Sequence, residues 1–238
     1  MLELSIGRDF CGPPRSGNGG YTAGLLANAM KTTEPVVVTL LAPPPLDTPL
    51  HVAVVEEGIE LRDGAVVVAS ASVCDKLNLA IPAAVTFEEA KDARSRFIGR
   101  HHHAIPGCFV CGTENPSGLR IHAGEVPGKN VVTADWVPSE NHIDPEGLVS
   151  SAIGWAALDC PGYFGAFVNE TPVFALLGRM SVETFRWPAL GEKCVVMGWL
   201  NRKRGRKIQV ASALCTADGE VLASSKATWV TVDSKKYL

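Results

Sequence analysis

The pattern of apolar and polar positions predicts one helix followed by strands in the first half of the chain. A glycine-rich turn at 17–20 opens an apolar stretch at 21–30 that is rich in Ala and Leu and predicts a helix. Runs rich in β-branched residues then predict three strands, at 35–41, 50–56 and 65–73.

The second half repeats this order of elements. Small and apolar residues at 148–159 predict another helix, which Pro161-Gly162 is expected to end. Strand-like runs follow it at 173–185, 192–200, 207–216 and 221–232. A helix followed by several long antiparallel strands, twice over, predicts two α+β units in tandem.

Turns at matching places support the repeat. Asp63-Gly64 and Asp218-Gly219 each precede a run of small and branched residues, and the second pair is typical of a hairpin. Pro45–Pro49 and Pro188–Glu192 each lie between two predicted strands. Because a single helix leaves much of a curved sheet uncovered, we expect each unit to cover the other.

The densest run of charge lies between the two halves. Residues 88–96 are charged or alanine except for Ser95, and His101-His102-His103 follow them. This composition is typical of a short solvated helix and a connector. We therefore predict an N-terminal unit at 1–85, a connector at 86–107 and a C-terminal unit at 108–238.

Composition narrows the class of protein. Apolar residues make up 46% of the chain and charged residues 20%, which is enough for a buried core. The net charge of −3 argues against a nucleic-acid partner, and no apolar run approaches the roughly 18 residues that a membrane span needs. Seven cysteines without a disulfide spacing indicate free thiols in a reducing compartment. We expect a soluble cytoplasmic protein.

Several short motifs recur in an order that resembles a known family. They are Asn18-Gly19-Gly20-Tyr21, Cys108-Phe109-Val110-Cys111-Gly112, Asn115-Pro116-Ser117-Gly118-Leu119, Ala156-Ala157-Leu158-Asp159 and Phe185-Arg186-Trp187-Pro188. In this order the chain resembles the hotdog-fold acyl-CoA thioesterases, with two hotdog units on one polypeptide. The resemblance implies a long helix wrapped by an antiparallel sheet in each unit, an acyl-CoA substrate, no cofactor, and assembly into a dimer of double units.

The resemblance also implies where the chemistry takes place. In such thioesterases the thioester carbonyl lies at the start of the hotdog helix, on a His-Gly-Gly-like turn, and an acid from the facing helix acts as base or nucleophile. Asn18, Gly19 and Gly20 match that turn with Asn in place of His, and Asp159 matches the acid. Free amides at a helix start can hold the oxyanion that forms during hydrolysis.

Aligning the two helices predicts a single working site. Gly19-Gly20 aligns with Ser150-Ser151, and Asn28 aligns with Asp159. One combination of turn and acid is therefore complete, and the other lacks both the glycines and the acid. The alternative is that Gly19-Gly20 is only a loop and that Asp159 caps the helix before Pro161, although an acid in a last turn opposes the helix dipole.

The Cys108/Cys111 pair also suggests a metal, but it supplies only two of the four ligands of structural zinc. His101 to His103 and His122 lie near it in sequence and leave a Cys2His2 set open. Because no second CxxC exists and the spacing is irregular, we predict no metal. A redox CxxC would need a thioredoxin-like context that is absent.

Two further groups are candidates for substrate binding. Five of the seven residues at 201–207 are basic, and we expect Arg202, Lys203, Arg204 and Arg206 to contact the phosphates of coenzyme A unless they form only a solvated turn. Tyr21, near the first helix, is expected to line the pocket.

Two other functions remain open. Because the turn has Asn18 in place of His, the protein could instead bind acyl-CoA without hydrolysing it. Asn141-His142-Ile143-Asp144 resembles part of the Asp/His dyad of hotdog enoyl-CoA hydratases, although a histidine in this context is more often a turn residue. Thiol release, loss of the enoyl double bond, or neither would separate the three functions.

Overall fold

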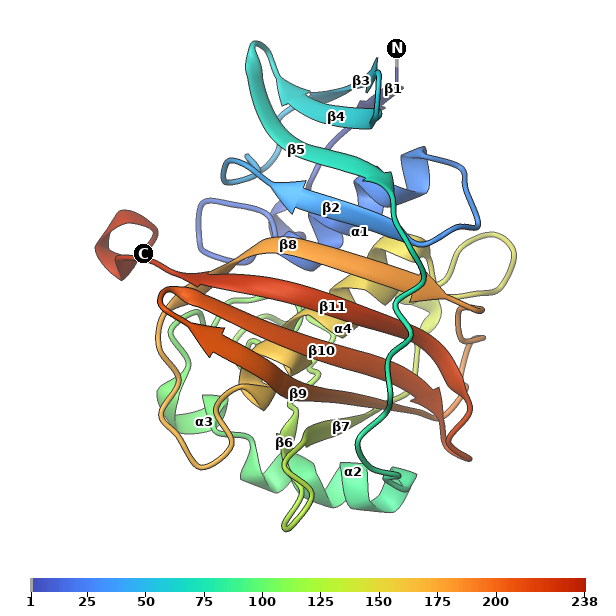
Figure 1. Ribbon diagram of the computed structural model, residues 1–238, viewed down its shortest axis with the longest axis vertical. Coiled ribbons are helices and arrows are strands. Elements are labelled where there is room, and N and C mark those ends of the chain that lie inside the picture. The colour runs from blue at the N-terminus through green and yellow to red at the C-terminus, as the bar shows by residue number, and fades with distance from the viewer. Residues whose placement is uncertain (1) are drawn as a thin grey trace.

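The computed structural model describes residues 2–238, and Figure 1 shows one large sheet with two helices behind it. The helices are α1 (Gly19–Ala29), α2 (Phe87–Ala93), α3 (Gly99–His102) and α4 (Ser151–Gly165). The strands are β1 (Leu2–Leu4), β2 (Val36–Leu40), β3 (Leu50–Val55), β4 (Gly58–Asp63), β5 (Val66–Val73), β6 (Gly124–Glu125), β7 (Val132–Trp136), β8 (Ala175–Thr184), β9 (Cys194–Arg204), β10 (Lys207–Thr216) and β11 (Val221–Thr231).

All strands join in one antiparallel sheet, in the order β1-β3-β4-β5-β2-β8-β11-β10-β9-β7-β6. The two halves meet where β2 pairs with β8, with Val38 opposite Met180. Outward from that pair, β5, β4, β3 and β1 occupy the same places in the first half as β11, β10, β9 and β7 in the second. The predicted α+β class is confirmed, because each half supplies one long helix and its own part of the sheet.

The matching turns are also confirmed as equivalent hairpins. Gly64 lies between β4 and β5, and Gly219 lies between β10 and β11. Both have a positive φ, +55° and +91°, which glycine adopts without steric cost. The turns at 45–49 and 188–192 likewise connect the first two strands after each long helix.

Helices α1 and α4 run antiparallel and pack against each other in the centre of the molecule. A Cβ atom at Gly20 would lie 2.6 Å from Cβ of Asp159, and one at Gly24 would lie 2.7 Å from Cα of Ala152. Glycine is therefore required at both contacts, because nothing larger fits between the helices. The largest core cluster surrounds this contact and includes Leu26 and Leu158, which are fully buried.

The segment between the halves is more than a solvated connector. After β5 the chain crosses the outer face of the second unit's strands, in front of the sheet in Figure 1, and then forms α2. Ala90 and Ala93 are fully buried there against a cluster that includes Val195 and Met197 of β9. The predicted helix is present, and a capping box between Thr86 and Glu89 starts it.

One predicted helix end needs correction, and several strands were not predicted. The second helix does not end before Pro161 but continues through it to Gly165. Its last turns lie directly on the backbone of β9, where a Cβ at Gly198 would lie 2.0 Å from the carbonyl oxygen of Pro161. This close packing offsets the hydrogen bond that proline removes. Strands β1, β4, β6 and β7 were not predicted, although residues 59–62 and 132–136 alternate apolar and polar side chains.

In residues 2–238 no helix has both the length and the apolar character needed to span a bilayer.

Replacing Gly24 by Ala tests the helix contact. The new methyl group would lie 2.7 Å from Cβ of Trp155, so we expect a loss of about 1–3 kcal/mol of stability in urea denaturation, despite the better helix propensity of Ala. Gly107→Ala is the control, because a Cβ there meets nothing within 4 Å. Equal stability of the Gly24 variant and the wild type would contradict the close contact.

Candidate functional site

Asp159 is the buried acid at the centre of the molecule. It lies inside α4, facing the start of α1, and its residue is only 1% exposed. Since α4 continues for six residues beyond it, Asp159 is not the helix cap that the alternative interpretation required. Its carboxylate lies instead at the amino end of the facing helix.

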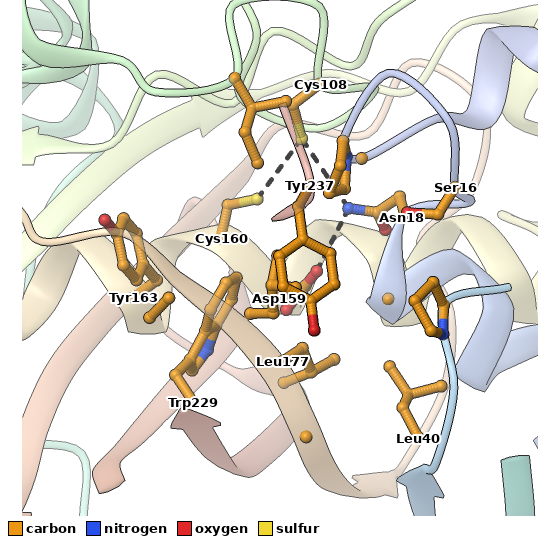
Figure 2. A pocket seen from close by; sticks show the side chains of 18 of the residues that line it. Ser16, Asn18, Leu40, Cys108, Asp159, Cys160, Tyr163, Leu177, Trp229 and Tyr237 are labelled. Atoms are coloured by element: carbon orange, nitrogen blue, oxygen red, sulfur yellow. Dashed lines mark hydrogen bonds between the residues drawn. The ribbon is translucent and has the colours of Figure 1, made fainter. Parts of the chain in front are cut away.

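The amino end of α1 holds this carboxylate through two donors, of which Figure 2 shows the Asn18 side chain. The Gly20 N–H donates to Oδ2 of Asp159 at 3.1 Å, and Nδ2 of Asn18 donates to the same oxygen at 3.2 Å. Asn18 is the N-cap of α1, because its Oδ1 accepts the N–H of Tyr21 at 2.8 Å. This cap bond fixes the amide orientation, so the nitrogen must point at Asp159.

One amide at the start of α1 remains without a protein acceptor. The Asn18 N–H donates to Phe10, the Gly20 N–H to Asp159 and the Tyr21 N–H to Asn18. For the Gly19 N–H, residues 2–238 provide no hydrogen-bond acceptor. Gly19 also lines the adjacent cavity, so this free donor is available to a ligand.

Burial raises the pKa of the Asp159 carboxyl to about 7, and negative charge on Cys108 adds to the rise. The hydrogen bonds from Gly20 and Asn18 act in the opposite direction. Oδ1 of Asp159 is buried and has no hydrogen-bond partner in the described chain. An unpartnered buried carboxylate oxygen is costly, and this oxygen can accept a proton or bond a bound molecule.

A cavity of about 260 Å³ opens beside Asp159. Its walls come from both halves of the chain, and Figure 2 shows Leu40, Leu177 and Trp229 around the acid, with Tyr237 in front of it. Most of the lining is apolar or aromatic. The cavity is therefore suited to an apolar group whose polar end lies between Gly19 and Asp159.

Three cysteine side chains line the same cavity. Cys108 and Cys111 come from the CxxC turn, and Cys160 follows Asp159 in α4. Hydrogen bonds from the two neighbouring thiols hold the pKa of Cys108 well below its usual value. The pKa of Cys111 is raised, chiefly by burial, and that of Cys160 is raised chiefly by its hydrogen bond to Cys108.

His103 and His122 do not complete a Cys2His2 set with the CxxC pair, and the side chain of His102 lies outside the described part of the chain. Nδ1 of His103 accepts the Ile105 N–H, so its Nε2–H donates to the carbonyl oxygen of Cys111 at 3.1 Å. His122 stacks on Phe97, and its Nε2 lies 3.4 Å from the carbonyl oxygen of Gly112. Both rings therefore contact the backbone of the turn.

The helix starts correct the predicted alignment of the two units. The N-caps align Asn18 with Ser150, one residue away from the predicted alignment, so Ala27 rather than Asn28 is equivalent to Asp159. Ala27 carries no acid, and Asn28 is exposed to solvent. The Ser150 side chain makes no cap hydrogen bond.

The other predicted residues lie outside the cavity lining. Tyr21 stacks on Phe10 with ring centroids 4.1 Å apart, and it is not among the lining residues. The basic residues lie at the end of β9 and in its hairpin with β10, where Lys203 pairs with Glu170. The hairpin is close to one end of the cavity, because the carbonyl oxygen of Arg206 accepts the N–H of Thr231, between lining residues Val230 and Val232.

Several lining residues were missed by sequence reasoning. Cys160 is next to Asp159 in sequence but carries no spacing signal that links it to the CxxC turn. Tyr163 lies beyond the expected helix end, and Trp229 and Tyr237 lie close to the C-terminus. Only the packing of α4, β11 and the C-terminal segment within the second half brings these side chains to one cavity.

Comparison with known proteins identifies the fold. No family model matches the sequence, and no curated protein does. Among solved structures, a conserved protein of unknown function with a hot dog fold from Alicyclobacillus acidocaldarius matches with a TM-score of 0.63 and 12% identity, over 97% of this chain and 92% of that one. The tesB protein of Mycobacterium avium subs paratuberculosis matches with a TM-score of 0.61 and 14% identity, over 97% and 92%.

A protein from Novosphingobium aromaticivorans, provisionally assigned as a thioesterase, matches with a TM-score of 0.63 and 12% identity over 97% of this chain and 95% of that one. At such identities the likeness shows the fold. The expected hotdog fold is confirmed, and nearly the full length of the chain takes part in it.

Asn18 variants separate its two hydrogen-bonding roles. Asn18→Ala removes both the helix cap and the donor to Asp159, so we expect about 1–2 kcal/mol less stability in urea denaturation. Asn18→Ser keeps a capping oxygen and loses the amide donations to Asp159 and to Sγ of Cys108, so its stability should lie closer to that of the wild type. Equal losses in the two variants would show that the cap contributes nothing.

Proposed function

We propose that this hotdog protein hydrolyses acyl-CoA thioesters at one composite site per chain. The observation that carries the proposal is the contact between a buried acid of one unit, Asp159, and the amino end of the other unit's helix at Gly20, beside an apolar cavity. An acid, a free backbone donor and an apolar pocket are the three parts that thioester hydrolysis requires.

Asp159 is the general base in the proposed reaction. Its ionised carboxylate can take a proton from water as the water attacks, and Oδ1, which has no protein partner, is the oxygen free to do so. The tetrahedral intermediate then expels the CoA thiolate, which the same proton can neutralise. Direct attack by the carboxylate is the alternative, and it would form a mixed anhydride that water hydrolyses.

The oxyanion is held by the Gly19 N–H in this proposal. The Gly20 N–H already donates to Asp159, so it positions the acid rather than the substrate. Gly19 is one residue closer to the cavity, and the positive end of the α1 dipole adds to its effect. The role expected for Gly19 and Gly20 together is thus divided between them.

The acyl group enters the apolar part of the cavity. Leu40, Leu177 and Trp229 provide walls without charge, and Tyr163 and Tyr237 add aromatic surface. The proposed hydratase alternative has less support, because His142 and Asp144 lie outside this lining. His142 accepts the Ser139 N–H, and Asp144 accepts the N–H groups of Glu146 and Leu148 within its own turn.

Replacing Asp159 by Asn tests the proposed acid. The amide keeps the shape but cannot accept a proton from water, so we expect kcat for acyl-CoA hydrolysis to fall by at least about 100-fold. Free CoA is measured by chromatography, because the seven protein thiols would react in a thiol assay. Asp218→Asn is the control, since Asp218 lies on an exposed hairpin and should leave kcat unchanged.

The outcome also separates hydrolysis from binding alone. A wild-type protein that binds acyl-CoA and releases no CoA would support the non-catalytic alternative. Unchanged hydrolysis by a folded Asp159→Asn variant would overturn the role of Asp159 and leave only the fold.

The basic hairpin is proposed to bind the phosphates of coenzyme A. Arg202, Arg204 and Arg206 are exposed and form no ion pair within residues 2–238, unlike Lys203. In Arg202→Gln/Arg204→Gln/Arg206→Gln, KM for acyl-CoA should rise several-fold with kcat nearly unchanged. KM for the corresponding acyl-pantetheine thioester, which lacks these phosphates, should not change. A parallel rise for both substrates would contradict phosphate contact.

A further inference from the structure

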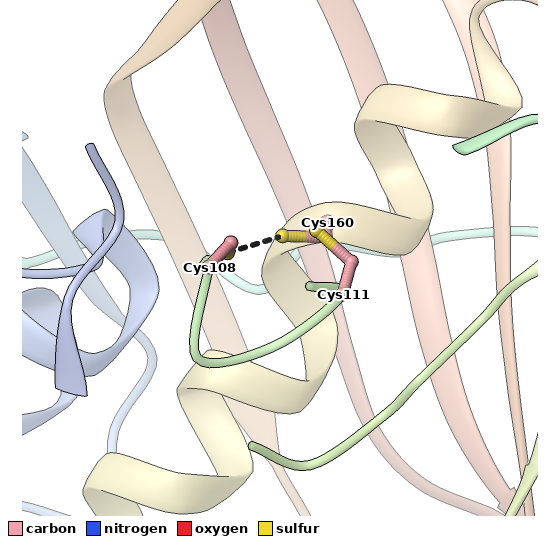
Figure 3. A group of neighbouring side chains, drawn as sticks. All are labelled: Cys108, Cys111 and Cys160. Atoms are coloured by element: carbon pink, nitrogen blue, oxygen red, sulfur yellow. Dashed lines mark hydrogen bonds between the residues drawn. The ribbon is translucent and has the colours of Figure 1, made fainter. Parts of the chain in front are cut away.

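The three thiols beside Asp159 form a group with the geometry of a metal site. Sγ of Cys108 lies 3.9 Å from Sγ of Cys160, and Sγ of Cys111 lies within 4.8 Å of both (Figure 3). Tetrahedral coordination with Zn–S bonds of about 2.3 Å separates two sulfurs by about 3.8 Å. A disulfide would instead bring them to about 2.05 Å. The observed Cys108–Cys160 separation matches two ligands of a shared ion.

The ligands come from two rigid segments. Cys108 and Cys111 belong to a tight turn that Gly112 permits, because a Cβ there would lie 2.4 Å from the carbonyl oxygen of Cys108. The turn is held by the bond from Gly112 N–H to that oxygen and by the bond from His103 to Cys111. Cys160 is fixed in α4. Supporting contacts of this kind orient the ligands of metal sites.

We propose that Cys108, Cys111 and Cys160 bind one d10 cation that prefers thiolate ligands, Zn²⁺ or Cu⁺. Thiolate sulfur selects these ions over Mg²⁺ or Ca²⁺. Binding forms three S–metal bonds and releases each proton that the three sulfurs still carry. A cation also offsets the cost of burying thiolates, which are at most 4% exposed here.

The fourth position of this site is open. In the described chain no fourth His, Cys, Asp or Glu joins the group. All three cysteines line the cavity, so the vacant coordination position faces the space beside Asp159. Three protein ligands with one free position are typical of zinc sites that take water or an exogenous ligand, not of closed structural sites.

Metal titration of the full untagged chain tests the proposal without any substrate. The protein is stripped with chelator under a phosphine reductant and titrated with Co²⁺, which reports thiolate ligation by a sulfur-to-cobalt charge-transfer band. Zn²⁺ then displaces Co²⁺, and competition with a chromophoric chelator gives the affinity for Zn²⁺. A parallel titration against a Cu⁺ chelator gives the affinity for Cu⁺. We expect one ion per chain, and the higher of the two affinities identifies the preferred ion.

Matched variants locate the ion. Cys160→Ser and Cys111→Ser should each weaken binding by more than about 100-fold, because loss of even an outer-shell partner costs 10 to 100-fold. Cys215→Ser, a buried cysteine outside the group, should bind as the wild type does. Thermal unfolding monitored by circular dichroism confirms that each variant is folded.

Three outcomes would overturn the site. They are no Co²⁺, Zn²⁺ or Cu⁺ bound at micromolar concentration by the reduced wild type, undiminished binding by a folded Cys160→Ser variant, and a Co²⁺ spectrum without the charge-transfer band. These readouts do not depend on hydrolysis, so loss of the metal proposal and loss of the proposed function are distinguishable.

Discussion

The close antiparallel approach of α1 and α4 is the constraint on which the rest of the molecule depends. Gly20 and Gly24 have no side chains, and the space that a Cβ would occupy is filled by Asp159, Ala152 and Trp155 of the other helix. This approach brings a buried acid to the amino end of a helix, where a backbone N–H and the helix dipole can hold a negative charge. The same close contact therefore holds the two helices together and positions the acid.

Duplication within one chain lets the two equivalent places diverge. At one of them Asn18 bonds Asp159, whereas the equivalent residues at the other are Ser150 and Ala27. Two identical chains would have had to keep both sites alike. The CxxC turn is also present only in the second half, so the thiol group lies at one of the two places and beside the acid.

The segment between the halves has a structural role of its own. Ala90 and Ala93 of α2 bury the outer face of the second unit's strands, together with Val85. The bond from Nζ of Lys226 to the carbonyl oxygen of Leu77, and the bond from the Leu77 N–H to Glu183, hold the crossing chain to the sheet. This cover removes apolar surface that would otherwise be exposed to water.

Periodicity and turn chemistry are local, so the repeat of one helix and several strands, and the turns at Gly64 and Gly219, could be predicted from the amino acids alone. The motif resemblance also pointed to Asp159 as the acid facing Gly19-Gly20. The sequence did not determine that α4 continues through Pro161, since a local rule is overridden there by backbone packing on β9. Nor could it assign Gly20 to the acid and leave Gly19 free, or bring Cys160 to the CxxC turn. The first relation depends on how the two halves pack against each other. The second depends on how the CxxC turn packs on α4 within the second half. Both join segments that are distant in sequence, so only the tertiary structure fixes them.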